Sequence, residues 1–168
     1  QVNLCQWVIS ADTTTPVEYW TENNKLCARY ANGVKLVMRL AGFGKEGDWL
    51  GHGSCPVRFE GDAGWVEAGD NGTLAVSDPA LLGGKMPPEM AGVDPAKHVR
   101  DFLDSVKSRS KPACDSTVTR HSEIACHAAA ISWKLGRKLD FDPENERFID
   151  APDADALCSR PRRAPFTI

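Results

Sequence analysis

The fold class follows from one stretch of sequence, Lys25-Leu26-Cys27-Ala28-Arg29-Tyr30-Ala31-Asn32-Gly33-Val34-Lys35-Leu36-Val37-Met38-Arg39-Leu40-Ala41. Two β-prone runs, residues 25–31 and 34–41, flank the dipeptide Asn32-Gly33. This dipeptide tolerates the positive φ angles of a type I′ turn, so the stretch predicts a β-hairpin. Every second residue from Val34 to Leu40 is apolar, which indicates that one face of the hairpin packs on a core.

Further strands are expected on both sides of this hairpin. Turn-rich segments at 61–64 and 69–72 separate three short β-prone runs and predict a meander. With one run before the hairpin, the chain has about six strands, at residues 17–20, 25–31, 34–41, 57–60, 65–68 and 73–76.

Two helices are predicted after the meander. The first begins with Asp94 as cap and Pro95 at the first helical position, and it stops near Ser108. Its apolar stripe consists of Val99, Phe102, Leu103 and Val106. The second helix begins between residues 116 and 119 and ends at Leu135-Gly136, where glycine suits a left-handed cap. It has two apolar sides, which predicts two packing partners: Ile124, Ala128, Ile131 and Leu135 on one, and Cys126, Ala129, Ala130 and Trp133 on the other.

The ends of the chain differ from its middle. Residues 1–10 have helical spacing, and we expect them to be the remainder of a helix whose start is absent. Residues 140–168 contain several prolines and are expected to form an extended tail with few core residues and one short helical piece near residues 153–158. A single domain over residues 1–168 is the default for this length.

Composition excludes several classes of protein. The 20 basic and 23 acidic residues give a net charge of −3, which disfavours nucleic-acid binding. The longest apolar stretch is too short and too polar to cross a membrane, and no secretion signal is visible. Six scattered cysteines favour buried thiols over three disulfides, and we therefore expect a reducing, cytoplasmic location.

The sequence Gly42-Phe43-Gly44-Lys45-Glu46-Gly47 matches the GxGxxG pattern of dinucleotide sites. That pattern binds a pyrophosphate only where the loop opens a helix. Here Gly51, Gly53 and Pro56 follow, and the preceding strand belongs to a hairpin. We therefore interpret residues 42–47 as a glycine-rich loop without a nucleotide.

Candidate binding residues are few. Asp48 and His52 lie in the same glycine-rich loop, which either closes over a ligand or is a solvated connector. His121 and His127 are too far apart around their helix for a shared metal, so packing is the simpler role for each. Arg163 belongs to a short basic cluster, for which a solvated or carboxylate-paired stretch is favoured over an anion-binding site. The sequence predicts no metal site and no complete catalytic site.

Several strings, in order, resemble the C-terminal domain of the Gfo/Idh/MocA oxidoreductases, closest to the bacterial branch. They are Asn3-Leu4-Cys5-Gln6-Trp7, Ala31-Asn32-Gly33-Val34-Lys35, Phe59-Glu60-Gly61-Asp62-Ala63-Gly64-Trp65-Val66, Phe102-Leu103-Asp104-Ser105-Val106-Lys107-Ser108, Leu135-Gly136-Arg137-Lys138-Leu139, Ser159-Arg160-Pro161 and Arg163-Ala164-Pro165-Phe166.

The resemblance implies an α+β fold, with an open, mostly antiparallel sheet of about six or more strands and helices packed on one face. It also implies an N-terminal Rossmann domain, outside this chain, that binds NAD or NADP. Such enzymes transfer a hydride to or from a sugar, polyol or related carbohydrate. Their C-terminal domain lines the substrate cleft and forms homo-oligomers through the sheet.

Within that resemblance, Asn3 stands where the family often has an aspartate. An amide cannot act as a base, so Asn3 is expected to orient a substrate hydroxyl. Asp48, His52, His121 and Arg163 complete the expected substrate-binding set. Two alternatives stay open, a non-catalytic dimerisation or glycan-binding module and part of an NAD-dependent glycosidase of the same family.

Overall fold

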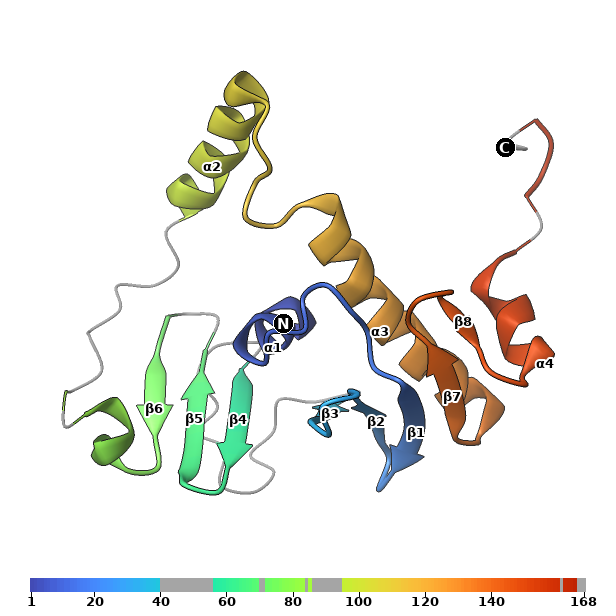
Figure 1. Ribbon diagram of the computed structural model, residues 1–168, viewed down its shortest axis with the longest axis horizontal. Coiled ribbons are helices and arrows are strands. Elements are labelled where there is room, and N and C mark those ends of the chain that lie inside the picture. Colours follow the sequence, from blue (N-terminus) through green and yellow to red (C-terminus); the bar gives the residue numbers. More distant parts are fainter. Residues whose placement is uncertain (40–55, 70–71, 84, 86–94, 161, 166–168) are drawn as a thin grey trace. The chain divides into compact units, whose positions relative to one another are not determined.

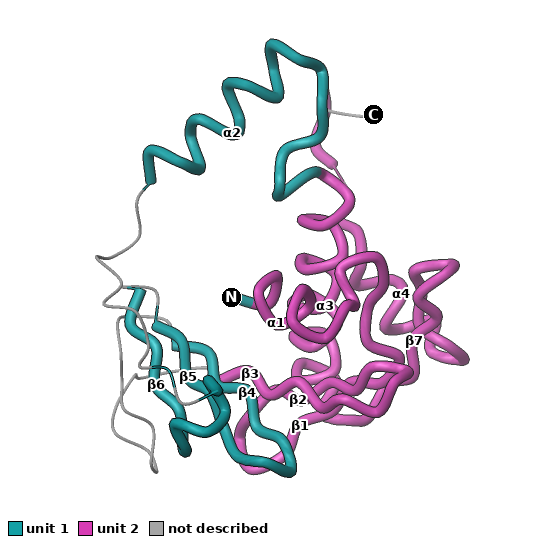
Figure 2. The backbone as a smooth tube through the Cα atoms, turned by 60° about the vertical axis from the view of Figure 1, so that its left-hand side comes forward, with its two compact units in different colours: residues 1, 41–115 teal, residues 2–40, 116–168 magenta. Residues whose placement is uncertain are grey.

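A computed structural model describes residues 1–39, 56–69, 72–83, 85, 95–160 and 162–165. Their contacts separate the chain into two compact units (Figure 2). Unit 1 comprises residues 1 and 41–115, and unit 2 comprises residues 2–40 and 116–168. That one domain spans residues 1–168 stays a prediction.

Unit 2 contains a five-stranded antiparallel sheet (Figure 1). Its strands are β1 (Glu18–Glu22), β2 (Lys25–Arg29), β3 (Lys35–Met38), β7 (Leu139–Asp142) and β8 (Arg147–Phe148), in the order β3-β2-β1-β7-β8. The first three strands form a meander. β7 returns from far along the sequence to pair with β1, with Glu18 opposite Asp140. The sheet therefore joins the two ends of the chain.

The two tight turns of this meander differ. Between β1 and β2, Asn23 and Asn24 have φ angles of 49° and 58°, as a two-residue type I′ turn requires. Between β2 and β3, the Gly33 amide donates to the Tyr30 carbonyl at 2.9 Å and the Tyr30 amide donates to the Val34 carbonyl at 3.0 Å. That pattern closes a three-residue loop in which Gly33 has the positive φ, 89°. The predicted hairpin is confirmed, but its predicted type I′ turn at Asn32-Gly33 is wrong.

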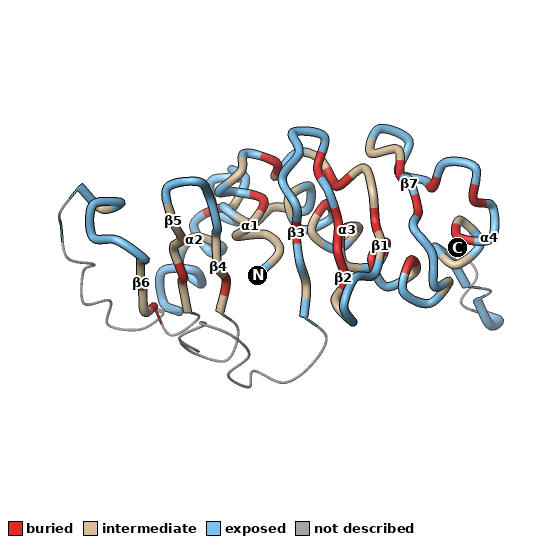
Figure 3. The backbone as a smooth tube through the Cα atoms, turned by 90° about the horizontal axis from the view of Figure 1, so that it is seen from below, coloured by how far each residue is buried: buried red, intermediate tan, exposed pale blue. Residues whose placement is uncertain are grey.

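Two helices pack against the sheet of unit 2. α1 (Val2–Val8) contacts α3 (Ser116–Leu135), and α3 contacts β1 and β2. Figure 3 shows α3 behind these two strands. α3 ends before Gly136, which has the left-handed φ of 64° that the sequence predicts. On the first of its two predicted apolar sides Ala128 is buried and the other members are partly buried. On the second side Ala129 is buried, whereas Trp133 is 52% exposed.

The core of unit 2 lies between α3, α1 and the sheet. Tyr19 meets Phe141 edge to face with ring centroids 5.7 Å apart, and Phe141 meets Phe148 at 5.2 Å. Both phenylalanines are buried, as are Ala151 and Ala154 around the short helix α4 (Pro152–Asp155). The 3-10 helix η2 (Ala156–Cys158) follows. The expectation of an extended tail with few core residues is therefore wrong for residues 140–151, because single aromatic residues anchor the two short strands there. The short helical piece expected near residues 153–158 is confirmed by α4 and η2.

Unit 1 contains a three-stranded antiparallel sheet, β4 (Val57–Gly61), β5 (Gly64–Ala68) and β6 (Leu74–Val76), followed by the 3-10 helix η1 (Pro79–Leu82). The predicted meander is confirmed. Across β4 and β5, Arg58 Nη2 lies 2.9 Å from Glu67 Oε2, and the two side chains are 5% and 0% exposed. The Arg58 guanidinium also lies over the Trp65 ring, 4.3 Å from its centroid. A buried ion pair thus crosses this sheet.

The helix α2 (Pro95–Ser108) has the predicted boundaries. Its stripe of Val99, Phe102, Leu103 and Val106 is 43–57% exposed. No helix in the described part of the chain is long and apolar enough to span a membrane. The predicted α+β class with open antiparallel sheets is confirmed, with strands in two sheets instead of one.

Candidate functional site

Asn3 lies in the first turn of α1 and is half-buried. Its side-chain Nδ2 is buried and has no hydrogen-bond partner among the residues that the structure describes. A neutral amide can donate two hydrogen bonds, so Nδ2 is a donor to which a ligand oxygen could bind. That Asn3 contacts a substrate stays a prediction.

Gln6, one helical turn later, fixes α1 to its surroundings. It is fully buried, and its Nε2 donates to the Thr14 carbonyl at 3.1 Å. Its Oε1 accepts from Ser122 Oγ on α3 at 2.6 Å. Both polar ends of the amide are thus satisfied by different segments, which positions α1 and with it Asn3.

His121 lies one residue before this contact on α3 and is 8% exposed. Its Nδ1 is 3.1 Å from the carbonyl oxygen of Asp12. Because a carbonyl only accepts hydrogen bonds, Nδ1 is the donor in this contact. His121 therefore ties the segment after α1 to α3, and its predicted contact with a substrate is untested.

The structure does not connect the other three predicted site residues with Asn3 and His121. Asp48 and His52 lie outside the described residues, as does the loop at 42–47. Arg163 is exposed near the C-terminus and has an interaction of its own. The structure thus places two of the five predicted residues, Asn3 and His121, on contacting helices and does not connect the rest with them.

The described cysteines are free thiols, as predicted, but only Cys27 among them is buried and Cys158 is exposed; they are Cys5, Cys27, Cys114, Cys126 and Cys158. Burial raises the pKa of Cys5, Cys27, Cys126 and Cys158. A raised pKa keeps a thiol protonated, and a protonated thiol is a poor nucleophile. Nor do His, Cys, Asp and Glu side chains gather into a candidate metal site anywhere in the described ranges. Thiol and metal chemistry therefore have no support here.

The sheet of unit 2 has a second face, opposite α3, which we call the outer face. Glu18, Trp20 and Glu22 from β1 alternate with the buried Tyr19 and point to it, as do Arg29 and Lys35. The strand register places the residues Asp140, Glu18, Arg29 and Lys35 side by side across four strands. The outer face therefore has two neighbouring carboxylates followed by two neighbouring cations, beside one tryptophan.

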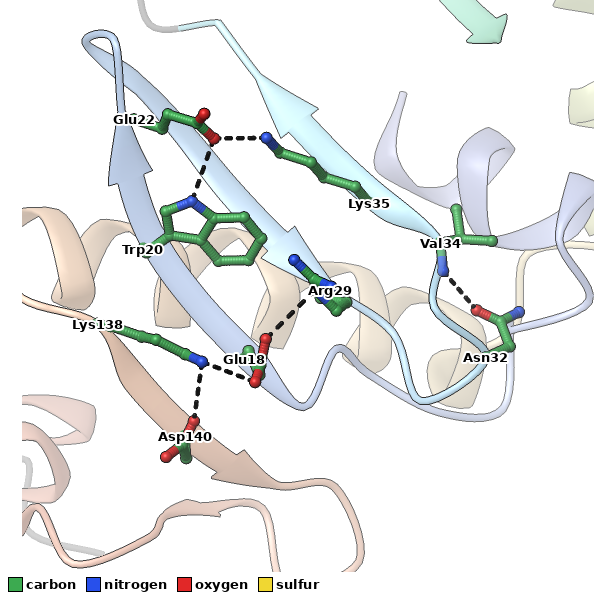
Figure 4. Close-up of polar contacts among 9 residues, drawn as sticks. All are labelled: Glu18, Trp20, Glu22, Arg29, Asn32, Val34, Lys35, Lys138 and Asp140. Atoms are coloured by element: carbon green, nitrogen blue, oxygen red, sulfur yellow. Dashed lines mark hydrogen bonds and ion pairs between the residues drawn. The ribbon is translucent and has the colours of Figure 1, made fainter. Parts of the chain in front are cut away.

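Figure 4 shows how these side chains meet around Trp20. The indole Nε1 donates to Glu22 Oε2 at 3.3 Å, and the same oxygen accepts from Lys35 Nζ at 2.5 Å. The Arg29 guanidinium carbon and Lys35 Nζ lie 5.4 and 5.3 Å from the centroid of the ring. Cation–π contacts and one shared acceptor thus fix the indole on the sheet.

Two carboxyl groups of the outer face, those of Glu18 and Glu22, have a pKa below the ordinary value. A hydrogen bond from Lys138 is the main cause that lowers the pKa of Glu18, with Arg29 adding to it. The hydrogen bond from Lys35 lowers the pKa of Glu22, with a further contribution from Trp20. Near neutral pH the outer face therefore presents fixed charges of both signs.

An open groove of about 960 Å³ runs over this region. Trp133 and Gly136 at the end of α3 extend it beyond the sheet, with Arg137 and Lys138. Two tryptophans and several charged groups are the residues that line it. Sequence reasoning did not name this surface, although the alternation Glu18-Tyr19-Trp20-Thr21-Glu22 marks a strand with one polar face.

Comparison with known proteins gives one match. The sequence pattern of an oxidoreductase family, described as the C-terminal alpha/beta domain of the Gfo/Idh/MocA group, matches residues 85–168. This match includes α2, α3, β7 and β8. No curated protein and no solved structure matches the chain.

Proposed function

Since the chain belongs to the Gfo/Idh/MocA oxidoreductase family, we propose that it is the substrate-facing and subunit-pairing domain of an NAD(P)-dependent enzyme. That enzyme transfers a hydride to or from a carbon of a sugar, polyol or related carbohydrate. One observation carries the proposal: α3, inside the matched segment, covers one side of a sheet that also contains β7, and no helix among the described residues of unit 2 lies over the outer face of that sheet.

The substrate role is assigned to the start of α1. Asn3 offers a buried amide donor, while Gln6 and His121 fix the helix and the segment after it. A hydroxyl of a carbohydrate can accept from Nδ2 and so be oriented for reaction. Asn3 cannot move a proton, because its amide does not titrate in the useful range. The proton must pass to a group outside the described residues.

The described residues do not fit NAD or NADP. A dinucleotide pyrophosphate is held by the N-terminus of a helix that a glycine-rich turn joins to a strand. α3 begins directly after Asp115, whose carboxylate would repel a phosphate and whose ion-pair partner, Lys111, is 83% exposed. We therefore propose that an N-terminal Rossmann domain binds the cofactor and that this chain supplies the opposite wall of the substrate cleft.

The pairing role is assigned to the outer face. In a two-fold dimer the same patch meets itself, so it must carry both signs of charge. Glu18 and Glu22 beside Arg29 and Lys35 meet this condition, and Trp20 supplies an apolar centre. Aromatic residues and arginine are enriched at such contacts.

The test is an assay of the whole protein with a panel of carbohydrates and glycosides, each with NAD and NADP. Hydride transfer to the nicotinamide supports the proposal, and Asn3→Ala should then lower turnover by roughly tenfold or more, because a misplaced substrate hydroxyl slows reaction. Asn145→Ala, an exposed loop amide, is the matched control. Release of a free sugar from glycosides would favour the glycosidase instead. Absence of both reactions would favour a non-catalytic module.

A further inference from the structure

The charges of the outer face are sorted by strand. On β1 the residues that point to this face include two carboxylates, Glu18 and Glu22 (Figure 4). Their register partners on β2 are cations, since Arg29 is opposite Glu18 and Lys25 is opposite Glu22. Residues directly opposite each other in an antiparallel pair lie on the same face. Lys35 on β3, opposite Arg29, continues the positive side. An acidic strand thus lies beside basic ones.

An apolar row separates these charges. Trp20 lies between the two glutamates along β1, and its register partner on β2 is Cys27. The row continues on β3 with Val37, which is 46% exposed although it is apolar. An apolar centre with charged residues around it is the usual anatomy of a contact between proteins. The middle of the outer face therefore suits a protein partner.

The charged residues keep capacity for such a partner. Arg29 Nε lies 3.3 Å from Glu18 Oε2, yet the two side chains are still 50% and 28% exposed. Lys35 and Glu22 form a similar pair, and these side chains are 40% and 49% exposed. A guanidinium has several donors and a carboxylate several acceptor positions, so one ion pair does not use them all. Each pair can therefore contact further charges on another protein.

Two copies of this surface can face each other in a limited number of ways. The two-fold axis of such a pair lies in the plane between the sheets, because only then does each copy face the other. Aligned sheets keep their strand directions within about 30° of each other, so the axis runs either along the strands or across them. An axis across the strands places β1 over β1 of the other copy, and glutamates then meet glutamates. An axis along the strands reverses the strand order and places β1 over β2, where glutamates meet cations.

We propose that two copies of this chain pair through their outer faces about a two-fold axis that runs along the strands, between β1 and β2. The inference rests on the pairing role proposed above and adds its orientation. Glu18 of each copy lies over Arg29 of the other. In the same way Glu22 lies over Lys25, and the apolar rows around Trp20 meet between them. Like-charge contacts disfavour the crosswise axis, so the charges select one orientation.

The test uses two variants of the whole protein, studied alone and mixed by sedimentation equilibrium. Glu18→Arg and Arg29→Glu each bring like charges together across the proposed axis. Each should therefore raise the subunit dissociation constant roughly tenfold or more. An equimolar mixture should pair as tightly as the unaltered protein, because a basic copy then meets an acidic one. Both variants lack the Glu18–Arg29 ion pair within their own chain, so this recovery comes from contacts between copies.

Glu123→Arg is the matched control. It makes the same change on α3, which covers the other face of the sheet, and the Glu123 side chain is 64% exposed. Pairing should stay unchanged in this variant. Single variants that pair as tightly as the unaltered protein, or a mixture that recovers nothing, would overturn the orientation alone if Trp20→Lys still weakens pairing. An unaltered protein that is monomeric would overturn both the orientation and the pairing role.

Discussion

Ser122 on α3 donates its hydroxyl to the side chain of Gln6 on α1 at 2.6 Å, although 116 residues separate them. Gln6 is fully buried, and its other end donates to the Thr14 carbonyl. One glutamine thus holds together the start of the chain, the segment before β1 and the long helix. Asn3, one turn away, takes its position from this contact.

Ser122→Ala should destabilise the protein by about 1–2 kcal/mol, because it leaves Gln6 Oε1 buried without its donor. Ser108→Ala is the control. Both serines donate to the carbonyl four residues earlier on their helix, and only Ser122 also makes the contact with Gln6. Denaturant unfolding of both variants checks the prediction. Equal losses would show that the contact with Gln6 contributes nothing.

Gly64→Ala should lower the free energy of unfolding by about 1–3 kcal/mol. Gly64 has a φ of 135°, and a Cβ there would lie 2.2 Å from Ser77 Oγ. Gly61→Ala is the control, because its Cβ would meet only the Gly64 carbonyl oxygen at 4.0 Å. The double variant Gly64→Ala with Ser77→Ala should recover part of the lost stability, because the clash with the Ser77 hydroxyl is removed. The strain of the backbone at residue 64 remains. Thermal unfolding measures all three, and a Gly64→Ala as stable as Gly61→Ala would refute the argument.

The Glu18 carboxyl group makes the free energy of unfolding decrease as the pH falls. Its folded pKa lies below the ordinary value near 4.5, so its contribution is complete above that value and is lost as pH falls through the folded pKa. Lys138→Met should raise the pKa of Glu18 toward 4.5 and flatten this dependence. NMR titration of the carboxyl carbon measures the shift, with Lys134→Met on α3 as control. A pKa unchanged by Lys138→Met would rule out the hydrogen bond from Lys138 as its main cause.

Trp20→Lys should weaken subunit pairing, because it places a further cation among Arg29 and Lys35 on the outer face. Sedimentation equilibrium should show the variant as a smaller species than the unaltered protein. Val8→Lys makes the same kind of change at the end of α1, where the side chain is 55% exposed, and should keep the original mass. An oligomer that survives Trp20→Lys would remove the outer face as the interface.

Local signals predicted much of the fold. Gly136 and Pro95 fixed one boundary each of α3 and α2, and the turns around residues 61–64 marked the meander of unit 1. The type of turn at Asn32-Gly33 could not be predicted, because this dipeptide suits both two-residue and three-residue loops. Only the pairing of Arg29 with Lys35 in the sheet distinguishes the two.

β7 and β8 were missed for a physical reason. They contain four and two residues, and their stability comes from Phe141 and Phe148 packing beneath a strand more than a hundred residues earlier. A single sequence does not show such long-range contacts. The same holds for the candidate site, where Asn3 was predicted through resemblance, whereas Gln6 and Trp20 gained their roles only from tertiary contacts.

In our proposal another domain holds the nicotinamide cofactor, and this chain forms the opposite wall of the substrate cleft. Isothermal titration calorimetry of the 168-residue chain with NADH and NADPH is the decisive measurement. We expect no heat of specific binding up to millimolar cofactor. Saturable binding of either cofactor at micromolar concentration would show that this chain holds the cofactor itself.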